Sequence, residues 1–455
     1  MFTPSHELLN PAIDRPALLR PRSPHRWPPP AGAGFIGRFV AATATTLGLL
    51  AGPPACAGEL GSDLAGLLDY ARARNPELAA MRHEADAATE RVQPAGALPD
   101  PVLRIELENI NNYGTSNAPS LLPSKVGDTK YTLMQPIALW GKRELRRDVA
   151  AAEAQQAAAR AGASWNELAS RIKTAYAQYF LAAGNERITR EVADLLARME
   201  QLAQARYAGG LAAQQDAIRA QLEQTAVGAE LIGLATDKRL AAAKLNALLA
   251  REAGAALAEP QALRPLPAAN GFDAAALAQR SSAANPAVAA ELARLRGAQS
   301  NRELTARNAY PDIQVGIVPT QVGTRITTWG LMLEMNLPLQ RESRRSQERE
   351  AEALVAAQRA RTQALQTQLV GELAENLAGL DAARRSEALI GSQLLPQSEL
   401  SLRSALVAYE NGKVDFATLL DAQRQIRKAR ADRLKAQAEA QMRLAEIERI
   451  VGEDL

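Results

Sequence analysis

The sequence is poor in aromatic residues, in cysteine and in long apolar runs. Phe, Trp and Tyr make up only 4% of its 455 residues, whereas apolar residues reach 47% because alanine is abundant. This composition favours long, closely packed helices over a core built on large side chains. Cys56 is the only cysteine, so no intramolecular disulfide can form. After residues 1–57, no segment approaches the roughly 18 apolar residues of a membrane helix, so insertion into a membrane would require β-strands.

Excess charge, histidine and catalytic motifs are also scarce. The net charge of +3 comes from the first 57 residues, and the nearly neutral remainder argues against a nucleic-acid partner. His83 is the only histidine after these residues, and no Cys, His and carboxylate cluster has the spacing of a metal site. The chain also lacks a nucleophile with its base and a phosphate-binding glycine loop. We therefore expect no cofactor, no bound metal and no enzymatic activity.

The first 57 residues predict an export signal. Arg38 precedes small and apolar residues at 39–51, and Ala55-Cys56-Ala57 supplies the small-x-small pattern that signal peptidase cleaves. Cleavage after Ala57 would remove Cys56 with the signal peptide. Two alternatives stay open, a lipid attached to Cys56 and a disordered leader on a cytosolic protein.

The rest of the chain contains one pattern twice. Its landmarks recur in order as Asn75-Pro76 and Asn285-Pro286, Pro99-Asp100 and Pro311-Asp312, Gln135-Pro136-Ile137 and Leu337-Pro338-Leu339, and Tyr207-x-x-Gly210 and Tyr409-x-x-Gly412. An offset of about 200 residues is too long for a solenoid unit. It predicts two copies of one module, residues 58–252 and 273–455, joined by an Ala- and Pro-rich connector at 253–272.

Each copy is expected to contribute two β-strands. Alternating apolar and polar residues predict strands at about 102–108 and 130–137 in the first copy, and at about 312–318 and 326–337 in the second. The last of these has the length of a transmembrane β-strand, about ten residues. For any single strand, a half-buried soluble sheet is the alternative.

Long helices are expected to fill the remainder of each copy. The tracts at 141–206 and 341–410 are each close in length to two shorter tracts placed end to end. Asp63 is expected to cap a first helix that runs to about residue 91, and Pro396 to kink the second long helix. Each module is then one long helix beside two stacked shorter ones, with its glycine turn at the end farthest from the strands.

Strand number limits how the chain can meet a membrane. Four strands cannot close a spanning barrel, and open sheet edges are not tolerated in lipid, so several chains must combine. Three chains would give twelve strands, an even number within the range of outer-membrane barrels. Two alternatives are a soluble alanine-rich bundle and a periplasmic adaptor, which would have small β-rich domains flanking one helical hairpin.

With these features, the sequence from 58 to 455 resembles the TolC family of outer-membrane efflux channels. The resemblance rests on the duplication, on the QPIALWGKR segment at 135–143 and on the two Tyr-x-x-Gly turns. It implies a mainly α fold with transmembrane β: a homotrimer whose 12-stranded β-barrel in outer-membrane lipid continues into a periplasmic α-helical tunnel.

The resemblance also implies a function. Channels of this family passively conduct substrates in tripartite efflux systems, together with a periplasmic adaptor and an inner-membrane pump, here of the resistance-nodulation-division type. The Trp-Gly-Lys-Arg sequence at 140–143 is similar to the heavy-metal subgroup. Metal ions, drugs and small peptides all stay open as substrates.

Site residues are implied at the helical tips. Adaptor-docking turn positions of the family match Tyr207, Gly210, Tyr409 and Gly412. The gate and constriction positions of the family fall on four residues of this chain. Asp421 matches an acidic pore position, and Thr418 stands where the family has a second acid. Val414 stands where the family has a basic lock residue, and Asp216 matches the acidic counterpart of that lock; Lys413 is a candidate to replace the missing basic residue. The resemblance therefore implies a thinner acidic ring and a weaker or rebuilt closed-state lock.

Overall fold

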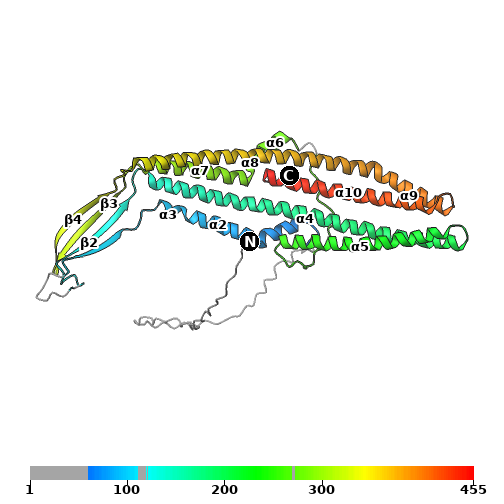
Figure 1. Ribbon diagram of the computed structural model, residues 1–455, viewed down its shortest axis with the longest axis horizontal. Helices are drawn as coiled ribbons and strands as arrows, with labels where there is room; N and C mark the ends of the chain where they lie inside the picture. The colour runs from blue at the N-terminus through cyan, green and yellow to red at the C-terminus, as the bar shows by residue number, and fades with distance from the viewer. Residues whose placement is uncertain (1–59, 111–118, 120, 269–271) are drawn as a thin grey trace, which may run out of the picture. The chain divides into compact units, whose positions relative to one another are not determined.

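The computed structural model describes residues 60–110, 119, 121–268 and 272–455, so the predicted export signal lies outside the described residues. The described chain is mainly helical and contains one four-stranded sheet (Figure 1). Its first half contains α1 (Leu64–Arg74), α2 (Pro76–Glu90), α3 (Val92–Gly96), β1 (Val102–Glu108), β2 (Asp128–Ile137), α4 (Lys142–Ala208) and α5 (Gln214–Leu248). Its second half contains α6 (Ala274–Ala284), α7 (Pro286–Arg307), β3 (Ile313–Val322), β4 (Arg325–Met335), α8 (Arg341–Leu389), η2 (Ile390–Leu394), α9 (Leu395–Glu410) and α10 (Phe416–Val451).

Helix α4 is the central element of the helical region. It packs against α2 and α5 from its own half and against α7 and α10 from the other half. Helix α8 in turn packs against α7 and α10. With 67 residues, α4 extends about 100 Å at 1.5 Å per residue, and it runs beside two shorter helices in succession (Figure 1). The predicted arrangement of one long helix beside two stacked shorter ones is confirmed.

An asparagine joins the stacked helices in each half. The side-chain oxygen of Asn75 caps α2, and its Nδ2 donates to the backbone carbonyl of Leu248 at the end of α5, 3.1 Å away. Asn285 caps α7 in the same way and donates to the Ile450 carbonyl at the end of α10, 2.7 Å away. Both asparagines are buried, and each satisfies groups at two helix ends at once.

The first helix is shorter than expected. Asp63 does cap it, accepting from the Gly66 amide, but α1 ends at Arg74 and the predicted continuous helix to residue 91 is wrong. The cause is the Asn75-Pro76 pair, since the residue before a proline is driven out of the helical region and Asn75 has ψ 121°.

Pro396 changes the second long helix in another way. Proline removes one amide donor, and its ring collides with the carbonyl four residues earlier. The chain widens into one π-helical turn, Ile390–Leu394, and then continues as α9. Helix α4, which has Asp194 at the matching position, is continuous. The interruption expected at Pro396 is therefore present as a π turn, which lets the helix continue past the proline.

The sheet has the order β1-β2-β3-β4, with every neighbouring pair antiparallel. Strand β1 has the predicted bounds. Strand β2 begins two residues earlier than predicted. Strand β3 begins one residue later and ends four residues later, while β4 begins one residue earlier and ends two residues earlier than predicted. Within the described part of the chain, β1 and β4 therefore each have one edge without a partner strand.

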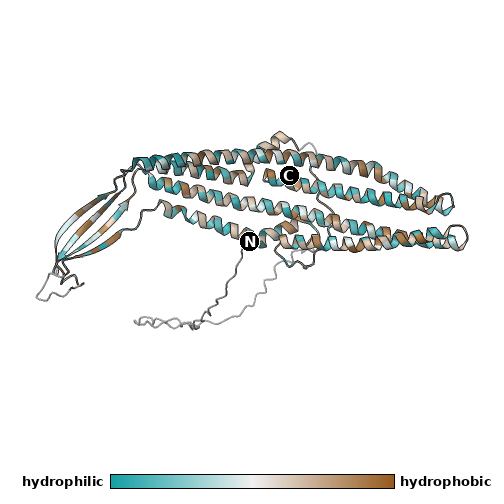
Figure 2. Cartoon of the chain, viewed as in Figure 1, coloured by the Kyte–Doolittle hydropathy of each residue, from teal (hydrophilic) through white to brown (hydrophobic). Residues whose placement is uncertain are grey.

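One face of the sheet is exposed and apolar. The register places Leu103, Leu133, Ile317 and Leu331 in one row across all four strands, and each is at least 44% exposed. Trp329, Leu333 and Met335 extend this surface along β4. Figure 2 shows hydrophobic and hydrophilic residues intermixed along the strands, as their alternation requires. A sheet with this face uncovered requires an apolar neighbour.

The Trp-Gly-Lys-Arg segment joins the two halves where strands meet helices. Trp140 and Gly141 both adopt left-handed backbone conformations, which turn the chain from β2 into α4. The Trp140 ring lies 5.0 Å from that of Tyr310, and the buried Lys142 ammonium binds the Tyr310 carbonyl (2.7 Å) and the Asp312 carboxylate (2.9 Å). The segment thus fixes the start of α4 to the turn that leads into β3.

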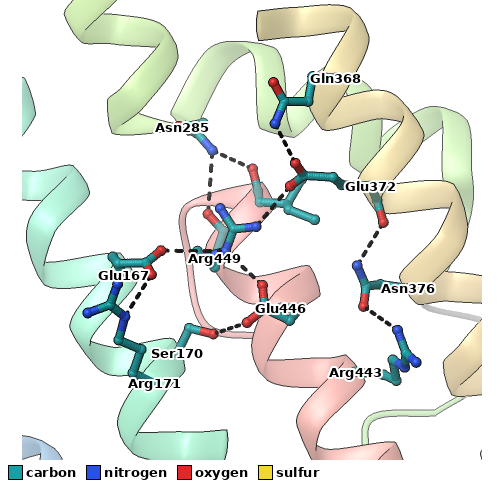
Figure 3. Close-up of polar contacts among 11 residues, drawn as sticks. Glu167, Ser170, Arg171, Asn285, Gln368, Glu372, Asn376, Arg443, Glu446 and Arg449 are labelled. Carbon is teal, nitrogen blue, oxygen red and sulfur yellow. Dashed lines mark hydrogen bonds and ion pairs between the residues drawn. The ribbon is translucent and has the colours of Figure 1, made fainter. Parts of the chain in front are cut away.

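Farther along the helices, Arg449 binds carboxylates from three of them (Figure 3). It contacts Glu446 on its own helix (2.8 Å), Glu372 on α8 (2.9 Å) and Glu167 on α4 (3.8 Å). Burial alone would lower the pKa of Arg449, but hydrogen bonds from its guanidinium to Glu446 and Glu372 raise it. This cluster lies beside the Asn285 cap and ties α4, α8 and α10 together.

We expect Lys142→Met to loosen the junction between the halves. The methionine leaves Asp312 and the Tyr310 carbonyl without their buried donor, which should lower the free energy of unfolding by about 1–3 kcal/mol. Urea unfolding of the detergent-solubilised protein measures the change. Arg345→Met is the matched control, because its ion pair with Glu342 is exposed and should contribute less than about 1 kcal/mol. Equal losses in the two variants would contradict the assigned role of Lys142.

Candidate functional site

Two helix–helix turns, α4–α5 and α9–α10, close with the same hydrogen bonds. In the first, the Gly210 amide donates to the Tyr207 carbonyl (2.9 Å) and the Leu211 amide to the Arg206 carbonyl (2.8 Å). In the second, the Gly412 and Lys413 amides bond in the same pattern, at 3.0 and 2.8 Å. Both glycines are left-handed, with φ of 70° and 69°. This is the Schellman ending, which favours glycine at that position.

The two turn tyrosines have different environments. Tyr409 is 1% exposed and packs edge-on against Phe416, with ring centroids 5.5 Å apart. Tyr207 is 47% exposed. The Tyr409 side chain is therefore part of the buried core beside the two turns, whereas the Tyr207 ring is exposed on the surface of the single chain.

That core draws on both hairpins. Its buried apolar residues come from α4, α5, α9 and α10: Val192, Leu196, Met199, Ala203, Ala220, Val227, Ala405, Tyr409, Phe416, Leu419, Leu420 and Ala422. Val414 packs against this cluster. The position that is basic in the resembled family is thus occupied by an apolar packing residue.

Arg206 connects the two turns. Its Nη1 donates to the Tyr409 carbonyl (2.6 Å) and the Glu410 carbonyl (2.5 Å), while Nη2 donates to the Leu211 carbonyl (3.1 Å). Its guanidinium carbon lies 5.0 Å from the Tyr409 ring centroid, within cation–π range. Sequence reasoning missed Arg206, although a basic residue in the last turn of a helix is the signal for binding terminal carbonyls.

Asp216 lies on α5 close to Tyr409. Burial, and then the negative charge of Asp216, raise the pKa of the Tyr409 hydroxyl. Among the described residues, no hydrogen-bond partner of normal geometry reaches that buried hydroxyl. The structure thus brings the predicted Asp216 and Tyr409 together across the two hairpins.

Thr418 has a structural partner at the start of α10. Asp415 caps this helix, accepting from the Thr418 amide (2.9 Å) and hydroxyl (2.6 Å). These two hydrogen bonds hold the pKa of Asp415 below its usual value. Lys413 is exposed, and its contribution to the turn is the backbone amide bond to the Ala408 carbonyl.

Asp421 lies on the exposed surface of α10. Its side chain is 69% exposed, and the Arg424 guanidinium is 4.0 Å away. The predicted site residues therefore divide into two groups. Tyr409, Asp216 and Val414 lie in or beside the shared core, whereas Tyr207, Lys413 and Asp421 lie on the surface.

A model of the outer membrane efflux protein family matches residues 67–251 and 277–453, one match in each half of the chain. The chain belongs to this family. The cobalt-zinc-cadmium resistance protein CzcC of Cupriavidus metallidurans is 26% identical over 409 residues, covering 88% of this chain and 92% of CzcC.

Solved structures agree on the fold. The outer membrane protein VceC of Vibrio cholerae has a TM-score of 0.72 at 18% identity, covering 86% of this chain and 96% of VceC. The open state of the Neisseria gonorrhoeae outer membrane channel MtrE has a TM-score of 0.69 at 17% identity, covering 86% and 89%. The protein is thus an outer-membrane efflux channel as predicted, and the periplasmic adaptor alternative is set aside.

The relatives are channel proteins rather than enzymes. Within the described residues, no helix combines the length and apolar character needed to cross a bilayer. Nor does the described part of the chain gather three His, Cys, Asp or Glu side chains as a metal site would require.

We expect Arg206→Ala to loosen the tips without unfolding the helices. The variant loses charge-assisted bonds to the Tyr409 and Glu410 carbonyls, so amide exchange at Gly412 and Lys413 should accelerate by about 5- to 30-fold. Hydrogen-exchange mass spectrometry of the detergent-solubilised protein measures this. The control is Arg198→Ala, an exposed arginine earlier on α4. The same protection in both variants would contradict the bridging role of Arg206.

Proposed function

We propose that three copies of this chain form one continuous conduit through the outer membrane and across part of the periplasm. The observation that carries this proposal is the four-stranded sheet. Among the described residues, its apolar face is uncovered and the outer edges of β1 and β4 have no partner strand. Joining β4 of one copy to β1 of the next would close twelve strands and face the apolar surface toward lipid. The long helices would continue the barrel as a tunnel.

The domain organisation follows from the same proposal. Residues 1–57 are a signal peptide that is removed on export, and residues 58–252 and 273–455 are two repeats joined by the connector at 253–272. The two separate family matches support this division.

The helical tips are proposed as the gate and the docking surface. A periplasmic adaptor would contact the turns at Tyr207, Gly210, Tyr409 and Gly412, and an inner-membrane pump of the resistance-nodulation-division type would supply the energy. Asp421, exposed on α10, would face the pore near its constriction, with Thr418 one turn earlier. Lys413 would lie at the mouth, and Asp216 and Val414 in the wall behind it.

Heavy-metal ions are the proposed substrate class. Support comes from the relative CzcC, which is named for cobalt, zinc and cadmium resistance. The channel would need no metal site of its own, since a conduit that releases ions should not hold them tightly. Growth of a deletion strain complemented with this chain, on graded cobalt, zinc, cadmium and an organic drug, tests the assignment. Resistance to the drug alone would overturn it.

We expect Asp421→Asn to weaken cation selectivity. Three copies would place three carboxylates around the pore, and neutralising them removes the local attraction for cations. Planar-bilayer recordings of the purified protein in a salt gradient should show the reversal potential moving toward zero, with multivalent-cation block reduced by about tenfold. Glu410→Gln, an exposed carboxylate at the α9–α10 turn, is the control. Unchanged selectivity and block in the Asp421 variant would remove Asp421 from the pore.

A further inference from the structure

One row of the sheet register marks the end at which the strands meet the helices. The row joins β2, β3 and β4 through Ile137, Ile313 and Met335. Beyond this row, Leu337 and Leu339 are 60% and 81% exposed, and the adjacent rings of Trp140 and Tyr310 are each about half exposed. Exposed aromatic residues at the end of an apolar band are typical of the level at which lipid hydrocarbon meets the headgroups.

Helix α8 starts directly after these apolar residues, and its first turns are rich in arginine. Arg341, Arg344, Arg345 and Arg349 all lie within about two and a half turns of its start. A positive charge in the first turn is unfavourable, because the N-terminal end of the helix dipole is itself positive. Among the described residues, no side chain caps the first amides of α8. An anion from outside the chain would therefore stabilise this end of the helix.

Three of these arginines form one stripe along α8. Arg341, Arg345 and Arg349 are spaced four residues apart, so they share one helix face, and all three are exposed. Arg345 has an exposed ion pair with Glu342, at 2.9 Å. Within the part of the chain that the structure describes, Arg341 and Arg349 have no carboxylate at ion-pair distance. Like charges at this spacing repel, so these three residues, here called the basic stripe, favour an anionic neighbour.

The polar face of the sheet continues onto one side of α4. Gln314 and Glu334 alternate with residues of the apolar face, so they lie on the opposite face of the sheet. Together with Arg146 of α4, they line a cavity of about 300 Å³. Glu153 lies seven residues after Arg146 and therefore on the same side of α4. This side of α4 is thus on the polar side of the chain.

A groove between α4, α7 and α8 shows on which side of the chain the basic stripe lies. The groove has a volume of about 400 Å³, and Glu153 of α4 lines it together with Leu354 and Arg361 of α8. Successive residues of a helix are rotated by about 100°, which places Leu354 and Arg361 roughly opposite the basic stripe. The stripe therefore lies on the side of α8 that continues the apolar face of the sheet.

The corresponding side of α4 is acidic. Glu144 and Asp148 lie roughly opposite Arg146 and Glu153 on this helix, by the same rotation of about 100° per residue. The basic stripe is therefore confined to α8. In a ring of three copies it would occur three times, with acidic surface between the stripes.

We infer that the basic stripe binds the phosphate groups of anionic phospholipid at the membrane surface from which the helices emerge, while the apolar side chains before it contact the acyl chains. A guanidinium can bind a phosphate with two parallel hydrogen bonds, and its charge favours anionic over zwitterionic headgroups. This inference rests on the proposed function for the position of the sheet in the membrane. The lipid preference of the stripe can be measured separately from strand closure.

The test is native mass spectrometry of the detergent-solubilised protein, titrated with equal amounts of phosphatidylglycerol and phosphatidylethanolamine. The parent should retain phosphatidylglycerol preferentially. R341Q/R345Q/R349Q should lower this preference by about fivefold or more, because each chain loses three charges next to the lipid phosphates. R341K/R345K/R349K should keep most of the preference, since the charges remain. R349Q alone should change in the same direction as the triple glutamine variant, which protects the test against misfolding of that variant.

The matched control is R359Q/R385Q/R403Q, which removes the same charge from exposed positions further along α8 and α9. Arg359 lies five helical turns beyond Arg341 on the same face, about 27 Å along the axis. This separation is well above the Debye length of about 8–10 Å. The control should therefore keep the lipid preference of the parent.

The outcomes separate the lipid site from the channel. No preference in the parent, or an equal preference in the parent and in both glutamine variants of the stripe, would overturn the inference. Stripe-dependent co-sedimentation with purified peptidoglycan, without a lipid preference, would also overturn it and would assign the stripe to the cell-wall polymer. The same spectra give the mass of the assembly, so a monomer would contradict the proposed three-copy conduit, while its lipid adducts would still decide the role of the stripe.

Discussion

The unpaired edges of a four-stranded sheet are the constraint on which the rest of this structure depends. Backbone amides and carbonyls along β1 and β4 need partners, and the apolar face that contains Leu103, Leu133, Ile317 and Leu331 needs an apolar neighbour. The residues that the structure describes in one chain supply neither. Because the strands lead directly into the long helices, any arrangement that pairs the edges also arranges the helices around the same axis. One requirement of the sheet would thus account for the proposed trimer, for its tunnel and for the position of the tips.

Duplication gives the two halves one plan, and the tips and the long helices depart from it. Asn75 and Asn285 make the same cap, and each donates to a carbonyl at the end of the later helix stacked against it, α5 or α10, so the joints are equivalent. The tips are not equivalent, since Tyr409 is buried and Tyr207 is exposed. The long helices also differ, because only the second contains a π turn. The symmetric features build the scaffold, and the asymmetric ones distinguish the second hairpin from the first.

Much of the fold could be predicted because its signals are local. Alternating residues located all four strands, and the left-handed Gly210 and Gly412 are the residues that a Schellman turn requires. The break at Asn75 was missed although its signal is also local, since an asparagine before a proline both ends one helix and caps the next. Hydrogen-bond and ion-pair partners on other helices could not be predicted from the sequence. Arg206, Arg424 and Arg427 look like ordinary solvated charges until tertiary packing brings carbonyls or carboxylates within reach.

The most direct test of the central claim is electron microscopy of the particle extracted from outer membranes in detergent. Edge pairing between copies predicts a three-fold particle, a short barrel continuous with a tube of helices about 100 Å long. It also predicts that β1 of each copy lies beside β4 of its neighbour. Monomers, dimers or rings in which the strands of adjacent copies do not meet would contradict the account.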